Sequence, residues 1–135
     1  MRAQNHRGLM GERLVAKNLR ARGFDVELAR EYNSPYDFIL NGKVRIEVKS
    51  CDGVKTKGQL RWFFNIHRHN VVNEKDVDYY VMRLGKVPEC TSPVHLLIPA
   101  PMGTPTINMT IRSLLQRYSV YAKAFNEFTP EKLKV

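Results

Sequence analysis

The sequence contains few cysteines and no long apolar run. Its two cysteines, Cys51 and Cys90, lie far apart and outside any metal-ligand spacing, so a disulfide-stapled secreted scaffold and a zinc finger are disfavoured. The best apolar stretch, residues 94–102, contains a histidine and two prolines and is shorter than the ~18 residues of a membrane span. The basic, amphipathic N-terminus has no apolar segment of the kind found in secretory signals, and we expect a cytoplasmic protein with reduced thiols.

Acidic residues are also scarce relative to basic ones. The 135 residues include 13 Asp plus Glu against 22 Lys plus Arg, a net charge of +9. This surplus favours a polyanionic partner, with nucleic acid first and anionic lipid second. Apolar residues at 43% and charged residues at 26% favour one folded domain over residues 1–135 and argue against disorder.

The apolar pattern predicts a mixed protein with helices at its two ends. Helical spacing extends over residues 6–22, where Gly23 supplies a stop, and again over residues 110–126. Six β-type runs are expected between them: residues 24–29, 36–40, 44–49, 60–66, 77–84 and 94–98. This order predicts an α/β or α+β domain with helices on the faces of a sheet.

Asn41 and Gly42 mark a hairpin between two of these strands. A two-residue loop would set apolar residues opposite charged ones. A three-residue loop or a bulge instead pairs Leu40 with Val44 and residue 38 with residue 46, which are all apolar. Burial therefore favours the second register.

The favoured register places an acid pair beside a lysine. Asp37 would lie directly opposite Glu47, with Lys49 two residues further along the same face. Carboxylates opposed at roughly 4.5–5.5 Å repel each other unless a cation lies between them. The alternative is an ordinary solvated strand face, which the unfavourable pairing of two acids makes the weaker interpretation.

Glu12 is a second unusual acid, because it lies on the apolar stripe of the first helix. A buried carboxylate is costly unless it is paired or bound to a metal. Gly8 and Gly11 would allow the helix to approach another backbone closely. A salt bridge from Glu12 to an arginine such as Arg45 is an equally weighted alternative.

Together these residues resemble a known superfamily of nucleases. The run from Ser34 to Asp37, followed by Glu47-Val48-Lys49 and preceded by a helix with Glu12, resembles the PD-(D/E)XK nucleases. Tyr36 separates Pro35 from Asp37, so the literal proline–aspartate pair is absent. The likeness extends to two branches, the archaeal Holliday-junction resolvases and the group I intron homing endonucleases. It implies a restriction-endonuclease-like fold, a central mixed β-sheet flanked by helices with an αβββαβ-type core.

The resemblance also implies a metal site and a reaction. Mg²⁺, for which Mn²⁺ would substitute, would be held by Asp37, Glu47 and the carbonyl of Val48, and Glu12 would complete the shell directly or through water. Lys49 would orient the attacking water or stabilise negative charge. The implied catalytic residues are Glu12, Asp37, Glu47 and Lys49.

Basic side chains around this site are candidate phosphate contacts, although several could belong to plain solvated faces. They are Arg7, Arg13, Lys55, Lys57, Arg61 and Arg68. Residues 61–70 interleave basic and aromatic side chains, which is typical of a nucleic-acid surface but equally of a core strand that runs into a basic loop.

These features predict a metal-dependent DNA endonuclease associated with the nucleoid through its substrate. A junction-selective resolvase is favoured over a sequence-specific homing or restriction-type enzyme because the chain offers few extra loops for reading base edges. A non-catalytic basic nucleic-acid-binding module is the alternative outside enzymes. Two antiparallel DNA strands favour a homo-oligomer, with a dimer first and residues 110–126 or a strand edge as interface. No membrane partner is expected.

Overall fold

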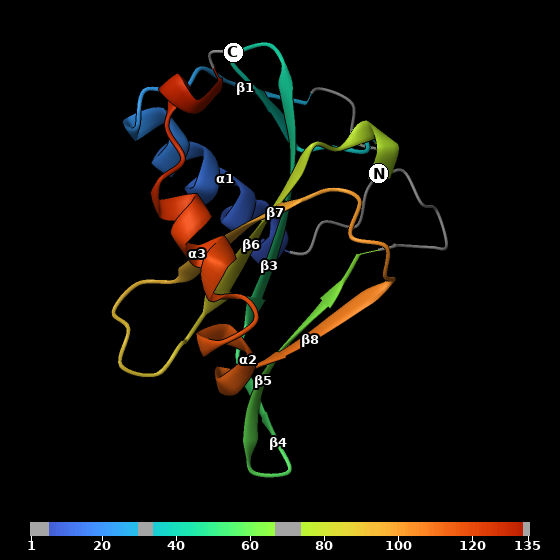
Figure 1. Ribbon diagram of the computed structural model, residues 1–135, viewed down its shortest axis with the longest axis vertical. Helices are drawn as coiled ribbons and strands as arrows, with labels where there is room; N and C mark the ends of the chain where they lie inside the picture. The colour runs from blue at the N-terminus through green and yellow to red at the C-terminus, as the bar shows by residue number, and fades with distance from the viewer. Residues whose placement is uncertain (1–5, 30–33, 67–73, 134–135) are drawn as a thin grey trace.

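The computed structural model describes residues 6–29, 34–66 and 74–133, and shows two β-sheets with helices packed on them (Figure 1). Its elements are α1 (His6–Ala21), β1 (Val26–Leu28), β2 (Phe38–Leu40), β3 (Val44–Asp52), β4 (Val54–Thr56), β5 (Gln59–Asn65), the 3₁₀ turn η2 (Glu74–Asp76), β6 (Tyr79–Gly85), β7 (Val94–Pro99), β8 (Thr106–Thr110), α2 (Ile111–Leu115), α3 (Ser119–Asn126) and the 3₁₀ turn η3 (Pro130–Leu133).

The larger sheet has the strand order β1-β2-β3-β6-β7. Strands β3 and β6 run parallel and the other neighbours run antiparallel, so the sheet is mixed. The smaller sheet, β4-β5-β8, is antiparallel. The predicted class, a mixed sheet flanked by helices, is confirmed. In the described part of the crossover from β3 to β6, the chain forms β4, β5 and η2.

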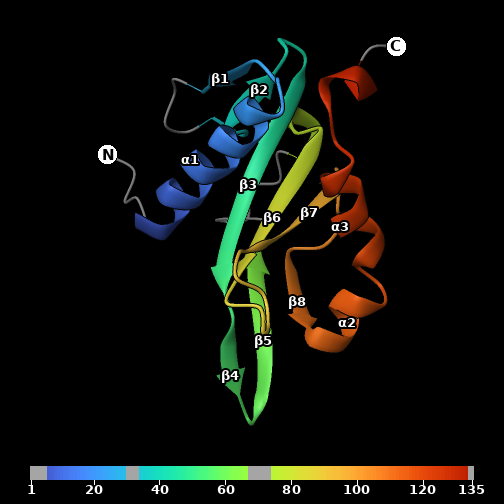
Figure 2. The same cartoon turned by 90° about the vertical axis from the view of Figure 1, so that its left-hand side faces the viewer.

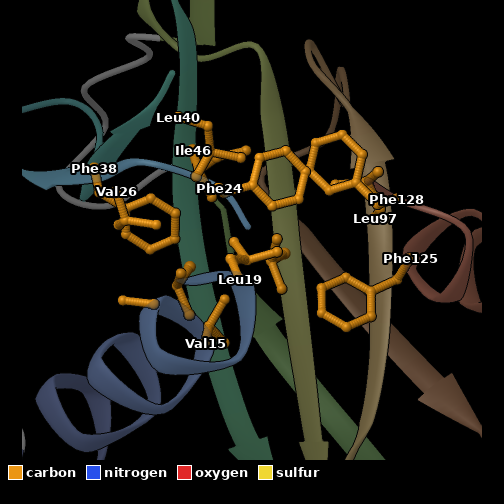
Figure 3. Close-up of a cluster of buried hydrophobic side chains, with 13 residues drawn as sticks. Val15, Leu19, Phe24, Val26, Phe38, Leu40, Ile46, Leu97, Phe125 and Phe128 are labelled. Atoms are coloured by element: carbon orange, nitrogen blue, oxygen red, sulfur yellow. The ribbon is translucent and has the colours of Figure 1, made fainter. Parts of the chain in front are cut away.

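Helix α1 covers one face of the larger sheet. Val15, Ala16 and Leu19 recur at helical spacing and are all buried, and the helix ends before Gly23, whose φ of +98° suits a residue without a Cβ. Figure 3 shows Val15 and Leu19 of α1 in the same cluster over the strands as Phe125, which lies on α3 near the C-terminus. The first and last helices therefore share one core.

The smaller sheet packs on the opposite face. Trp62 of β5 is fully buried there against Met82 of β6, and its indole Nε1–H donates to the carbonyl of Gly85 at 2.8 Å. Burial of a Trp of this size contributes on the order of 2–3 kcal/mol, and the hydrogen bond satisfies its polar group. The predicted core strand over residues 60–66 is confirmed.

One continuous helix over residues 110–126 is wrong. Residues 106–110 form β8, and Thr110 then caps α2 in a box in which it and Ser113 exchange side-chain-to-backbone hydrogen bonds. Two helices result, α2 and α3. Within the apolar stripe Phe125 is buried while Leu115 is 74% exposed. Among the described helices, none has the length and apolar character needed to span a membrane.

Candidate active site

The β2–β3 hairpin has the register that burial favoured. Leu40 pairs with Val44 and Phe38 pairs with Ile46, around a three-residue connection. Asn41 and Gly42 have φ values of +50° and +72°, a left-handed conformation that Asn and Gly tolerate best. The predicted pairing is therefore confirmed, and it holds β2 against the first three residues of β3.

Asp37 lies at a bulge where β2 begins. Its N–H donates to the carbonyl of Ile46 at 2.8 Å, and Ile46 also faces Phe38. Two residues of one strand thus oppose one residue of the other, which is the pattern of a β-bulge. Bulges re-aim side chains and are common beside active sites. Asp37 therefore departs from the predicted position directly opposite Glu47.

The bulge directs the Asp37 carboxylate to the edge of β3. Its Oδ2 accepts the N–H of Val48 at 2.7 Å, so the side chain takes the place that the β2 backbone would otherwise fill. Among the described residues, Asp37 is the one buried acidic, basic or amide side chain, with 7% of its surface exposed. A single hydrogen bond compensates only part of the desolvation of a carboxylate. The position therefore favours a further cationic ligand.

Val48 contributes its backbone to the same edge. In an antiparallel arrangement the N–H and C=O of one residue point to the same side of a strand. Because the Val48 N–H points to Asp37, its carbonyl oxygen points to that side too. A carboxylate and a backbone carbonyl, both hard oxygen donors, thus lie on the same side of β3, next to the start of β2.

Glu47 and Lys49 flank Val48 in the sequence. Their side chains lie on the face of β3 that carries the smaller sheet, whereas the Val48 side chain lies on the face that α1 covers. Their partners across the parallel β6 are Tyr80 and Met82, whose side chains lie in the core beneath the smaller sheet. Both Glu47 and Lys49 are half-buried, between that core and solvent. The structure therefore brings Asp37 and the Glu-Val-Lys segment together at one stretch of β3.

Glu12 approaches from α1, on the opposite face of the sheet. Its neighbour Gly11 packs so closely on β3 that a Cβ there would lie 2.7 Å from the Cβ of Ser50. The predicted close approach is thus observed at Gly11, and it brings Glu12, itself half-buried, near the strand of the candidate site.

The donor set fits a hard divalent cation with few protein ligands. Within residues 6–29, 34–66 and 74–133, no three His, Cys, Asp or Glu side chains group tightly enough to hold a metal. Mg²⁺ commonly binds through one or two carboxylates and keeps several waters, so Asp37, Glu47 and the Val48 carbonyl suit it. Both options for Glu12, direct coordination and contact through a water, stay predictions.

Arg45, the arginine named as a possible partner of Glu12, forms an ion pair with Asp78. Arg45 Nε donates to Asp78 Oδ2 at 3.1 Å, and the backbone N–H of Arg45 donates to the same oxygen at 2.8 Å. The side-chain hydrogen bond from Arg45 is the main cause that lowers the pKa of Asp78. The bond in turn raises the pKa of Arg45. The sequence gives no sign of this clamp between β3 and the residue before β6, because Asp78 lies inside the run predicted as a strand, residues 77–84.

The described candidate phosphate contacts lie on α1 and on the hairpin formed by β4 and β5. Arg13 is exposed on α1, and Lys55 and Lys57 are exposed on β4 and the turn after it. Arg61 is half-buried on β5, where its Nη2 donates to Gln59 Oε1 at 2.8 Å. The side chain of Arg7 and all of Arg68 lie outside the described residues.

Comparison with known proteins shows a shared fold. No protein-family model matches the chain, and no curated protein matches its sequence. Among solved structures the chain is similar to a bacterial homing endonuclease, I-Ssp6803I, with a TM-score of 0.67 and 15% sequence identity. The match covers 92% of this chain and 91% of that chain. At this identity the likeness shows the fold alone, and membership of the PD-(D/E)XK superfamily stays a prediction.

Proposed function

We propose that this protein is a Mg²⁺-dependent DNA endonuclease that hydrolyses phosphodiester bonds, acts as a homodimer and accepts Mn²⁺ in place of Mg²⁺. The observation that carries the proposal is the buried Asp37 carboxylate, aimed at the backbone of Val48 beside Glu47 and Lys49. The fold that positions these residues is shared with a homing endonuclease, and the net charge of +9 suits a polyanionic substrate.

Each residue of the site has a role in this proposal. Asp37, Glu47 and the carbonyl of Val48 would hold the cation, and Glu12 would orient a water. When bound, the cation would supply charge neutralisation at the scissile phosphate and a lower pKa for the attacking water. The Lys49 ammonium donates hydrogen bonds to that water or to the phosphate oxygen that gains charge. Arg13 holds a neighbouring phosphate.

The substrate class is the finer part of the proposal. The small size of the chain favoured a four-way junction over a defined duplex sequence. Two observations favour the duplex site instead: the structural neighbour is a homing endonuclease over nearly its full length, and a two-stranded hairpin projects beyond the sheet core (Figure 2). We therefore infer that a defined duplex sequence is the substrate, with the junction as second candidate.

Incubation with linear duplex, single-stranded and four-way-junction DNA, each with Mg²⁺ and with chelator, tests this function. Cleavage with Mg²⁺ that disappears with chelator is expected. Cuts at one sequence of a linear duplex support the duplex site, whereas paired symmetric nicks confined to the junction support the resolvase. Salt-dependent binding without cleavage in either metal would identify a non-catalytic binding module.

A further inference from the structure

The β4–β5 hairpin is only partly covered by the rest of the smaller sheet. Strand β8 pairs with β5 from Arg61 to Asn65, whereas β4 pairs with β5 from Gln59 to Arg61. The chain from Val54 to Arg61 is therefore a two-stranded ribbon. Figure 2 shows this ribbon extending past α2 and β8 as a continuation of β3.

One face of the ribbon points away from the core. Trp62 and Phe64 point inward and are buried, so the alternate residues of β5 point outward. Across the hairpin Val54 pairs with Arg61 and Thr56 pairs with Gln59, which places both pairs on one face. We call this the ribbon face, made up of Val54, Thr56, Gln59, Arg61 and Phe63.

The composition of the ribbon face is unusual for a solvated strand surface. Two large apolar side chains are exposed on it, Val54 at 61% and Phe63 at 54%. Residues 53–66 contain no Asp or Glu, although the chain has 13, and they contain three of its basic residues, Lys55, Lys57 and Arg61. A partner that suits this face is negatively charged, presents hydrogen-bonding edges and has apolar groups between them.

Resting on the proposed endonuclease function, we propose that the β4–β5 hairpin inserts into the major groove of duplex DNA and reads base edges with the ribbon face. The groove is about 12 Å wide and admits a two-stranded β-ribbon. Arg61, which Gln59 already holds at 2.8 Å, binds the O6 and N7 of a guanine, and Gln59 contacts a neighbouring base. Val54 and Phe63 contact thymine methyl groups, while Lys55 and Lys57 bind flanking phosphates.

The continuity of β3 and β4 sets how far the read bases lie from the cut. Val54 and Thr56 follow Val48 by six and eight residues. The alternation of side chains between the two faces continues through Gly53, since a Cβ built on Gly53 would lie 3.0 Å from the Trp62 ring. At about 3.3 Å per residue the ribbon face begins roughly 20–26 Å from Val48. At about 3.4 Å per base pair, the specified bases lie within roughly 6–8 base pairs of the scissile phosphate.

Selection from duplex DNA with a randomised central segment, carried out in chelator, tests the proposal because it requires binding and no cleavage. The intact chain should enrich a motif. Arg61→Ala should lose discrimination at one base pair by roughly 5- to 150-fold, with a smaller loss at other positions. Lys132→Ala, an exposed cation of η3, is the matched control and should keep the motif unchanged.

The other possible outcomes distinguish a failure of the hairpin proposal from a failure of the endonuclease proposal. An enriched motif that Arg61→Ala and Phe63→Ser both leave intact overturns the role of the hairpin, while DNA binding stands. Binding without any enriched motif, or a dimer that sedimentation shows to depend on Val54 and Phe63, also overturns it. A hairpin-dependent motif in a protein that never cleaves DNA supports the hairpin and contradicts the endonuclease. Absence of DNA binding contradicts both.

Discussion

The two edges of β3 differ in how completely they are paired. Along the edge shared with β6, seven consecutive residues from Ile46 to Asp52 have partners in register. Along the edge shared with β2 only three residues are paired, after which the bulge and the Asp37 carboxylate take over. The first edge fixes the position of the strand, and the second carries the carboxylate and the carbonyl of the proposed cation site. Pairing is thus continuous on one side of the strand and interrupted on the other, where the proposed site lies.

The largest effect is expected from the interrupted edge. Asp37→Asn keeps the shape and an oxygen that can accept the Val48 N–H, but removes the negative charge that would bind the cation. Cleavage in Mg²⁺ should fall by a hundredfold or more, on the order of 3 kcal/mol, and Glu47→Gln should behave similarly. Cleavage rates measure this, with thermal unfolding as a check of folding. Glu27→Gln, an exposed acid on β1, should retain activity. Full activity in a folded Asp37→Asn variant would refute the site.

A methyl group at Gly11 tests the packing of α1 on β3. The added Cβ would lie 2.7 Å from the Cβ and 2.8 Å from the Oγ of Ser50, so the helix must shift. Gly11→Ala should lower the free energy of unfolding by roughly 1–3 kcal/mol in urea denaturation. Combining it with Ser50→Gly removes the clash and should recover part of that loss relative to Ser50→Gly alone. Equal effects of Gly11→Ala in both backgrounds would contradict the close contact.

Acid should weaken the fully paired side of the sheet through His95. Burial, followed by the charges of Arg83 and Arg22, lowers the pKa of His95 to about 4 from 6.5, and its ring stacks on Phe125. Between these values the unfolded chain binds a proton that the folded chain does not, so stability falls as the pH drops from 6.5 towards 4. The change is about 1–2 kcal/mol after allowance for solvent screening. Urea denaturation across this range should show a flatter profile for His95→Gln, and an unchanged profile would contradict the assignment.

The smallest effect is expected at the clamp that joins β3 to the start of β6. The lowered pKa of Asp78 means that its contribution is fully present above the ordinary value of 3.8 and is lost as the pH falls through the lower, folded value. Asp78→Asn should reduce the free energy of unfolding at pH 7 by about 0.5–1 kcal/mol, since both partners are partly exposed. The difference should shrink in high salt. A salt-independent loss would point to packing.

The parts of the fold that were predictable are those in which local pattern and burial agree. The register of the β2–β3 hairpin follows from pairing Phe38 with Ile46, and α1 follows from its apolar spacing and Gly23. Both depend on residues close in sequence.

The parts that were not predictable depend on distant contacts or on competing local signals. The bulge at Asp37 could not be seen, because one shifted hydrogen bond leaves no mark in the alternation. Strand β8 was not predictable because its buried residues, 107 and 109, alternate with exposed ones over too short a span. The strong helical stripe that follows it led to a predicted helix that begins at residue 110. Strand β4 is three exposed residues long, and only its pairing with β5 defines it.

Calorimetric titration of Mg²⁺ or Mn²⁺ into the DNA-free protein measures cation binding at the open edge of β3 without any substrate. We expect a saturable signal in the unaltered chain and in Glu27→Gln, and its loss in Asp37→Asn. The same affinity in a folded Asp37→Asn variant would contradict the account.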